Sequence, residues 1–499
     1  MSIVDRAIAA ISPRWAFRRR QYYALLAQYD AAKPGRLRKN RNDSSSGTTL
    51  AERSAVQLRN YARYLHRNHD VARGALRILV NNTVGPNGIG VEPQPLNRDG
   101  EIIEPLAKQL LDLYRDWSLL PEVTGQMSWA RAQRMVALSW YRDGEVLSQV
   151  LAGPVRKLNH GTRVPLSLEL LESDYLPMDY SDTGKRIRNG IEVNAWGRPV
   201  NYWVFKQHPG DSGVFVRRQD LKSVPASRML RLALVDRLGQ LRGVSEFASI
   251  MTRLDDIKDY EESERIAAKV AASMAAVIKK GSPDEYKPVF DENGNTVPRN
   301  MKFRPGMIFD DLLPGESIET IDTNRPNPNV ESFRTGQIRA ASAGVGVSYS
   351  SMSKDYNGTY SAQRQEMVEQ WVNYAVLSSD FISGFVQPVW RHFVAAAHAA
   401  GLLDIPDDID WETLDDAMFV TPAMPWIDPK KEADAFTTLE AAGYISGPEI
   451  IRRRGGNPSE TLKQEANWRK KAQEAGVGLS FGKAGANTKQ EQGNDNQTA

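Results

Sequence analysis

Four carboxylates lie close together in one stretch of this sequence: Glu145, Glu169, Glu172 and Asp174. Carboxylate oxygens are the ligands that hard divalent cations such as Mg²⁺ prefer, and pairs of such cations promote phosphodiester cleavage. A metal-dependent nucleic-acid-processing enzyme would need clustered acids of this kind, so these residues keep that functional class open as an alternative. That interpretation requires the four side chains to converge in the folded chain.

Other catalytic signatures carry less weight. His66 and His69 lie beside Asp70, but they are three residues apart, and the helical zinc motif H-E-x-x-H places its histidines four apart. We expect packing or solvent exposure for both. Residues 478–482 fit G-x-S-x-G, yet the triad histidine must follow the serine, and all six histidines precede it. No P-loop sequence occurs, so we expect no ATPase. We expect no catalytic residues, no bound metal and no cofactor.

Composition places the chain among ordinary globular proteins, with 499 residues, 41% hydrophobic and 25% charged. There are no cysteines, which excludes disulfides and thiolate chemistry. No apolar stretch is long enough to predict a membrane span. The net charge is only +3, but residues 1–41 are strongly basic. This arm is either a solvated, flexible segment or a contact for nucleic acid or an acidic neighbour.

Three long helical segments are the strongest structural signal. Residues 245–280 contain neither glycine nor proline and would reach about 50 Å as one helix. Residues 330–344 and 361–403 are the other two, with Ser361 as the expected N-cap of the last one. Two polar, Gly-containing inserts, 281–329 and 344–360, separate the three segments. Rigid helices joined by a long mobile loop are more typical of a mechanical part than of a catalytic one.

The remaining segments predict an α+β protein. Helical periodicity is found in residues 51–84, 106–117 and 129–143. Residues 145–237 alternate like strands, with a hairpin turn at 194–199. A group of short helices follows in residues 430–476.

One face of the first long segment is acidic. Asp255, Asp259 and Glu262 share this face because residues separated by three or four positions align on a helix. An ordinary solvated helix face would give the same pattern. Farther along, a run of alanines from 267 to 276 makes the helix slim, and small side chains allow helices to approach closely. We therefore expect this segment to pack against copies of itself.

Several short sequences between residues 50 and 475 stand in a recognisable order. They are ARYLHRNHDVARGALRILVNNTVGPNGI (62–89), Asp143-Gly144-Glu145, LELLESDYLP (168–177), GIEVNAWGRPVNYWVF (190–205), VPASRMLRL (224–232), GQLRGVSEF (239–247), TYSAQRQE (359–366), WIDPKKEADA (426–435) and GYISGPEIIRRRGGNP (443–458). In number, order and spacing they resemble the lambda-type portal proteins of tailed bacteriophages, the head–tail connectors.

The resemblance implies a portal-type α+β fold with named parts. These are a basic flexible N-terminal arm (1–49), a wing of helices plus a β-rich unit (50–244), a first stem helix (245–280), a clip (281–329), a second stem helix (330–344), a tunnel loop (345–360), a long kinked wing helix with a return segment (361–429), a helical crown (430–476) and a disordered tail (477–499).

The resemblance also implies a function. Portal proteins form a ring of about twelve subunits at one capsid vertex, through which double-stranded DNA is packaged and ejected. The expected partners are the terminase large subunit, the major capsid or scaffold protein and a head–tail adaptor. The protein would assemble in the host bacterial cytoplasm and remain in the virion, without membrane contact. It would not be an enzyme, because in this family the ATPase belongs to the terminase.

Candidate site residues follow from the same resemblance. The tunnel loop would contact DNA through Ser348, Lys354, Tyr356 and Asn357, with a weak, sequence-independent grip on phosphates. The acids Asp255, Asp259 and Glu262 would line the stem lumen, where like charge keeps DNA sliding. Two alternatives remain, the metal-dependent enzyme above and a structural collar protein without a channel.

Overall fold

The computed structural model describes residues 12–15, 17–18, 44–212, 220–272, 276–280, 292–294, 316–320, 329–424 and 428–476. The predictions for the N-terminal arm, for most of the segment 281–329, for the G-x-S-x-G pentapeptide and for the tail 477–499 therefore lie outside the described residues. Within those residues, no helix is both long enough and apolar enough to cross a membrane.

A layer of helices forms the centre of the described chain. It contains α3 (Gly47–Asn68), α4 (Asp70–Thr83), α5 (Glu104–Trp117), α6 (Trp129–Asp143), α10 (Tyr360–Phe381) and α11 (Gln387–Ala399). His69 separates α3 from α4, and its Nε2 lies 2.8 Å from the carbonyl oxygen of Leu254. The main core lies among these helices, where buried aromatic rings such as Trp117, Trp390 and Phe393 pack together.

Antiparallel sheets flank the helices, so the predicted mixture of helix and sheet is confirmed. One sheet orders β3 (Leu166–Glu172), β2 (Glu145–Ala152) and β8 (Met229–Ala233). Another orders β4 (Ile187–Arg188), β5 (Ile191–Val193), β6 (Pro199–Phe205) and β7 (Leu221–Pro225). The predicted hairpin joins β5 to β6, and the Asn194 side chain accepts hydrogen bonds from the backbone of Trp196 and Arg198. A short pair, β1 (Gly90–Pro93) with β11 (Ala417–Val420), lies beside α5.

The first long segment differs from its prediction at both ends. A 3₁₀ turn, η5 (Glu246–Ser249), precedes α7 (Met251–Ala272), and β9 (Ala276–Lys280) then pairs with β10 (Glu316–Thr320). The prediction of helix over 276–280 is therefore wrong. Strand pairing with a partner so distant in sequence is a tertiary contact, and helix propensity could not indicate it.

The second and third long segments are confirmed with changes. α8 spans Val330–Val345. Thr359, and not Ser361, caps α10, because its side chain accepts a hydrogen bond from the Ala362 backbone. A short π-helix (Ile382–Val386) joins α10 to α11. Pro388, which cannot donate a backbone hydrogen bond, follows it. The helix ends at Ala399 and not at residue 403.

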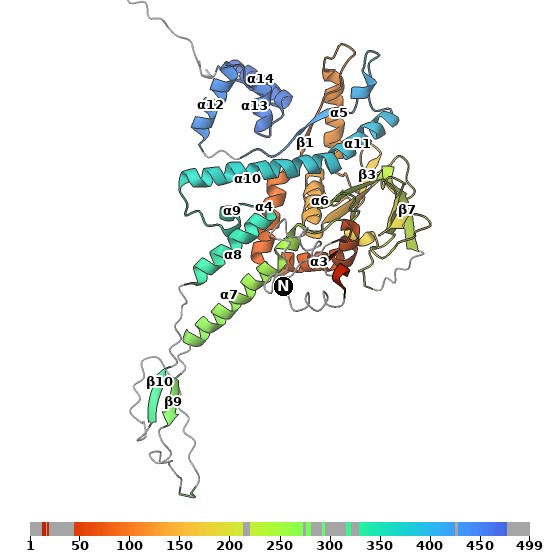
Figure 1. Cartoon of the computed structure of the whole chain (residues 1–499). Helices are drawn as coiled ribbons and strands as arrows, with labels where there is room; N and C mark the ends of the chain where they lie inside the picture. The colour runs from red at the N-terminus through yellow and green to blue at the C-terminus, as the bar shows by residue number, and fades with distance from the viewer. Residues whose placement is uncertain are drawn as a thin grey trace, which may run out of the picture.

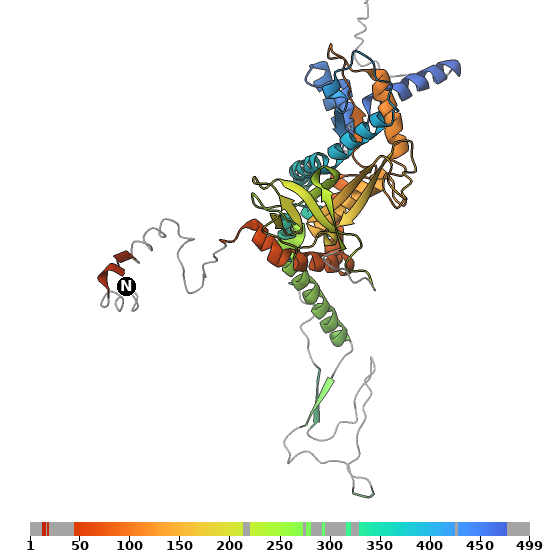
Figure 2. The same ribbon diagram turned by 90° about the vertical axis from the view of Figure 1, so that its right-hand side faces the viewer.

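Figures 1 and 2 show how these parts are arranged. α7 and α8 run side by side and project from the helical layer. The three C-terminal helices, α12 (Pro429–Ala441), α13 (Gly447–Arg453) and α14 (Pro458–Glu474), lie at the opposite end. Arg452 forms a bidentate pair with Glu92 and so attaches α13 to β1. The predicted group of short helices is thereby confirmed as secondary structure.

A buried ion pair joins the β2 sheet to the segment that enters α7. The Glu145 carboxylate accepts hydrogen bonds from Arg242 Nε (2.7 Å), Ser173 Oγ (2.7 Å) and the Gly243 backbone (3.2 Å). Arg242 is fully buried, and it also donates to the Asn189 carbonyl at 3.0 Å. These partners come from two other segments, residues 242–243 before α7 and Ser173 after β3, so the pair fixes where α7 begins relative to the sheet.

Two glycines allow that contact. Gly144 adopts a left-handed conformation (φ 86°) at the end of α6. A Cβ on Gly243 would lie 2.0 Å from the Gly144 oxygen, and a Cβ on Gly144 would lie 2.4 Å from the Val244 carbonyl carbon. The two backbones therefore touch directly, and no larger residue fits at either position.

We expect Gly243→Ala to destabilise the protein by about 2–3 kcal/mol, because its methyl group would collide with backbone and not with a flexible side chain. Gly74→Ala on α4 is the matched control: a Cβ there meets nothing within 4 Å, and alanine favours the helix. Chemical denaturation monitored by circular dichroism measures both. Equal stability of the two variants would contradict the close contact.

Glu145 should also make stability depend on pH. Burial alone would raise the pKa of this carboxyl, but the charge and hydrogen bond of Arg242, with Arg231, lower it to about 2. Because the folded-state pKa is depressed, this stabilisation is complete above the unfolded-state value and is lost as pH falls toward 2.

We therefore expect the melting temperature of the wild type to fall more steeply between pH 5 and pH 3 than that of Glu145→Gln, which cannot titrate at this position. The control is Glu169→Gln, which removes a partly exposed partner of Lys222 and should keep the wild-type slope. Parallel slopes for all three proteins in differential scanning fluorimetry would argue against the role of Glu145.

Candidate functional site

The connection from α8 to α10, residues 346–359, is the first candidate site. Gly346 ends α8 in a left-handed conformation (φ 67°), and a Cβ there would lie 2.6 Å from the Asn373 side-chain nitrogen. That nitrogen donates a hydrogen bond to the Gly346 carbonyl at 2.8 Å. Glycine is thus required both for the turn and for the close approach to α10.

The first half of this connection is folded. Residues Tyr349–Ser353 form the short helix α9, which packs against α4 and α8. Glu366 on α10 accepts hydrogen bonds from Ser350 Oγ (2.6 Å) and the Ser350 backbone (3.1 Å). Met352 is buried. The predicted long loop therefore contains a short helix in its first half, which a side chain of α10 holds in place. Only its second half is an exposed loop.

Three of the four predicted DNA-contacting residues lie together in the second half. Lys354, Tyr356 and Asn357 are exposed, and Tyr356 retains 58% of its accessible surface. Lys354 adopts a left-handed conformation (φ 60°) and forms no ion pair within the described residues. Ser348 differs: it is 7% exposed, and its hydroxyl caps α9 by accepting a hydrogen bond from the Ser351 backbone. The structure thus gives Ser348 a structural role, away from the exposed group.

The three acids predicted on the first long helix share the face of α7 that α8 leaves open. α8 packs on the other side, through Tyr260 against Phe333 (4.6 Å between ring centroids) and Glu261 with Arg334. Asp259 and Glu262 are exposed, and Asp255 is partly buried. Partial burial and the nearby charge of Asp259 raise the pKa of Asp255. The shared face is confirmed; its position in an assembly stays a prediction.

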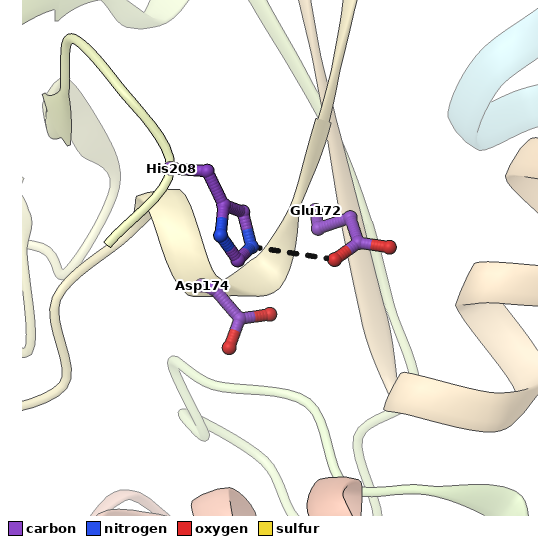
Figure 3. Close-up of side chains that lie close together, drawn as sticks. All are labelled: Glu172, Asp174 and His208. Atoms are coloured by element: carbon purple, nitrogen blue, oxygen red, sulfur yellow. Dashed lines mark ion pairs between the residues drawn. The ribbon is translucent and has the colours of Figure 1, made fainter. Parts of the chain in front are cut away.

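The carboxylates of the enzyme alternative converge only in part. Glu145 belongs to the buried pair with Arg242, and Glu169 binds Lys222 at 3.0 Å. Glu172 and Asp174 do come together, and His208, from the loop after β6, joins them with potential ligand atoms within 4.8 Å of one another (Figure 3). His208 Nε2 lies 3.5 Å from Glu172.

Arginines already neutralise this cluster. Arg63 contacts Asp174 at 2.7 Å, Glu172 at 3.1 Å and the buried Asp143 at 2.8 Å. Arg59 reaches Asp174 at 3.3 Å. A divalent cation would have to displace these guanidinium groups and then remain beside them, which electrostatic repulsion opposes. The cluster is better explained as an ion-pair network that joins α3 to the β-rich part than as a metal centre.

The sequence alone did not predict which of these charged residues contact one another. Nothing around His208 in the sequence pointed to Glu172, because the two meet only through the packing of a loop against β3. The short ordered sequences included both Asp143-Gly144-Glu145 and Arg242-Gly243. Nothing in those sequences indicated that the two segments contact each other. As expected, His69 is a packed residue, 4% exposed.

Comparison with known proteins identifies a family for this chain. The family described as "Phage portal protein, lambda family" matches residues 33–377. The probable portal protein of Halomonas phage phiHAP-1 is 26% identical over 442 residues, covering 86% of this chain and 82% of that protein. Portal protein B of Escherichia phage lambda is 20% identical over 326 residues, covering 59% and 60%.

Among solved structures, a chain from the neck of a native gene transfer agent (GTA) particle covers 83% of this chain and 99% of its own length, at 14% identity and a TM-score of 0.42. That likeness is too distant to carry an argument. The family match does not depend on it, since it extends over more than half of the sequence, from the basic arm through α10. The chain belongs to the lambda family of phage portal proteins.

Proposed function

We propose that this chain forms a closed ring at one capsid vertex and that double-stranded DNA is packaged and ejected through the channel of the ring. Membership of the portal family supports this proposal. The observation that carries it is the projecting pair α7 and α8, continued directly by the connection 346–359 (Figure 1). A paired helical projection followed by a short exposed loop suits the wall and the constriction of a channel.

The parts of the chain then take the following roles. α7 and α8 would be the stem, residues 281–329 the clip, the helical layer and sheets of residues 50–244 with α10 and α11 the wing, and α12–α14 the crown. Terminase and a head–tail adaptor would attach in turn to the ring, and the capsid or scaffold protein would surround the wing. Assembly would take place in the bacterial cytoplasm, and the ring would stay in the virion.

Lys354, Tyr356 and Asn357 are proposed as the DNA-contacting group. One unpaired lysine per subunit, repeated around a ring, gives a weak attraction to phosphates that carries no sequence preference. The anchored helix α9 fixes the position of this group. The exposed second half of the connection would then contact the DNA surface. The placement of Asp255, Asp259 and Glu262 in the lumen is proposed on the same basis, as a repulsive wall that prevents tight binding.

We expect the purified protein to form rings of about twelve subunits, because cyclic closure satisfies every head-to-tail interface equally. Native mass spectrometry at micromolar concentration and negative-stain microscopy measure this directly. A monodisperse monomer would contradict the proposal. A ring with no central opening would favour the collar alternative, and Mg²⁺-dependent DNA cleavage abolished by Asp174→Asn would favour the enzyme.

We expect Lys354→Ala to leave ring assembly intact and to reduce packaged or retained DNA by roughly half or more, because one phosphate contact per subunit is lost. Lys157→Ala is the matched control: Lys157 is also exposed and also left-handed (φ 64°), but lies between β2 and β3. Packaged length and infectivity are the readouts. If both variants package normally, Lys354 has no part in DNA handling; if Lys354→Ala loses the ring, its role is in assembly.

A further inference from the structure

Helix α10 carries apolar side chains on two opposite sides. On one side Tyr374 and Phe381 are buried in the core. On the other, Val368, Val372 and Val376 keep 45%, 65% and 55% of their accessible surface. Their four-residue spacing aligns them in one row along the helix. Val368 also lines a cavity with Phe436 and Leu439 of α12, and the row as a whole lies opposite the core face. An exposed apolar strip of this kind indicates a partner surface.

Two acids border this row. Glu369 and Asp380 are exposed, and they lie on the same flank because their separation of eleven positions is close to three helical turns. Neither acid has an ion-pair partner in the part of the chain that the structure describes. The face therefore combines a central apolar strip with an unpaired negative edge, and we call it the α10 valine face.

The groove between α4 and α6 has the opposite character. It has a volume of about 410 Å³, and Leu76 and Met135 contribute to its apolar lining. Its charged lining residues are Arg73, Arg77, Arg131 and Arg134, together with His66, and among the described residues no acid lines it. We call it the α4–α6 groove.

The arginines of this groove have no carboxylate partner among the described residues. Arg73, Arg77 and Arg131 form no ion pair with any described residue, and Arg134 donates only to the Pro86 carbonyl. Burial, and then the charges of Arg142 and Arg73, lower the pKa of His66. Elsewhere in the same layer, Arg59, Arg63 and Arg142 all contact carboxylates. A cluster of like charges with an apolar floor suits an acidic, partly apolar protein surface.

We propose that the α10 valine face of one copy docks into the α4–α6 groove of the next copy, with Glu369 and Asp380 meeting the arginines. This inference rests on the proposed ring and names one of its interfaces. The two surfaces differ in kind and complement each other in charge and in apolar content, which is what a head-to-tail interface requires. DNA phosphates could also satisfy the arginines, but they would leave the valines uncovered.

The two surfaces also belong to one rigid unit. Ring closure requires this, because the two interface surfaces of each subunit must keep a constant relative orientation. α10 packs on α4, where Ser378 Oγ donates a hydrogen bond to the Thr83 carbonyl at 2.9 Å. Trp140 on α6 lies 6.2 Å from Phe381 on α10. The angle between the valine face and the groove is therefore fixed within each subunit. A constant angle repeated from subunit to subunit produces a regular assembly, which is a closed ring when the rotation closes.

Charge reversal tests the pairing. Arg73→Glu with Arg77→Glu, or Glu369→Arg with Asp380→Arg, should reduce the fraction of protein in rings by about tenfold or more, since like charges then face each other. All four changes together should restore rings. The control is Arg53→Glu with Arg67→Glu, which makes the same change in charge on exposed positions of α3. Circular dichroism of each variant confirms that the subunit is folded.

Disulfide mapping gives an independent measurement because the native chain has no cysteine. We expect oxidised Arg77→Cys/Val372→Cys protein to give a ladder of covalent oligomers, and each single variant, or Lys157→Cys/Val372→Cys, to give none.

Rings that survive both charge reversals, with no ladder, would overturn this interface while leaving the proposed function standing. Rings that survive while Arg73→Glu/Arg77→Glu abolishes retardation of linear duplex DNA would assign the groove to nucleic acid. A monomeric wild-type protein would overturn both proposals.

Discussion

The buried pair of Glu145 and Arg242 is the contact on which the rest of the structure depends. Burying two charges is expensive unless each is fully hydrogen-bonded, and here the carboxylate and the guanidinium both have several partners. The pair lies where α6 ends, β2 begins and the chain turns into α7. The direct contact of Gly144 with the backbone at 243–244 fixes the same point sterically. Together with the contacts between α7 and α3, such as that of His69 with the Leu254 carbonyl, this junction holds α7 against the sheet and the helical layer.

A second ion-pair network surrounds this junction. Arg63 bridges Asp143 at the end of α6 to Glu172 and Asp174 at the end of β3, and His208 adds a contact from the loop after β6. The acids that could have formed a metal centre are used to join α3 to the β-rich part. Because these charges compensate one another inside the subunit, they leave little for an external ligand. This favours a structural role for the region.

Three other groups of charges have no ion-pair partner among the residues that the structure describes. The open face of α7 is acidic, the α4–α6 groove is basic, and the connection after α8 carries the exposed Lys354. The protein thus has two kinds of charged groups. Buried ion pairs stabilise the fold, and exposed charges without a partner in the chain are available for contacts with other molecules. The apolar valines on the outer side of α10 are also exposed. These exposed groups are the ones that the proposed ring would bring into contact with neighbouring subunits or with DNA.

The sequence by itself determined the features that depend on local periodicity and on residue order. It predicted α8, the core helices, the β5–β6 hairpin and the short C-terminal helices, and its ordered segments identified the family. Helical period, turn residues and caps act over a few positions, so a single sequence displays them. Even so, the cap of α10 was assigned to Ser361 and proved to be Thr359, because several hydroxyl residues near a helix start compete for the same role.

Tertiary structure decided the rest. The strand β9 formed where helix was predicted, because pairing with β10 replaced the local preference. Ser348 became a buried cap, and half of the predicted loop folded against α10, because Glu366 and Asn373 hold it there. The four carboxylates between 145 and 174 separated: Glu145 pairs with Arg242, Glu169 pairs with Lys222, and Glu172 and Asp174 pair with Arg63. The strand pairing, the anchoring of the loop and the ion pairs depend on residues far apart in sequence, whose contacts exist only once the chain has packed.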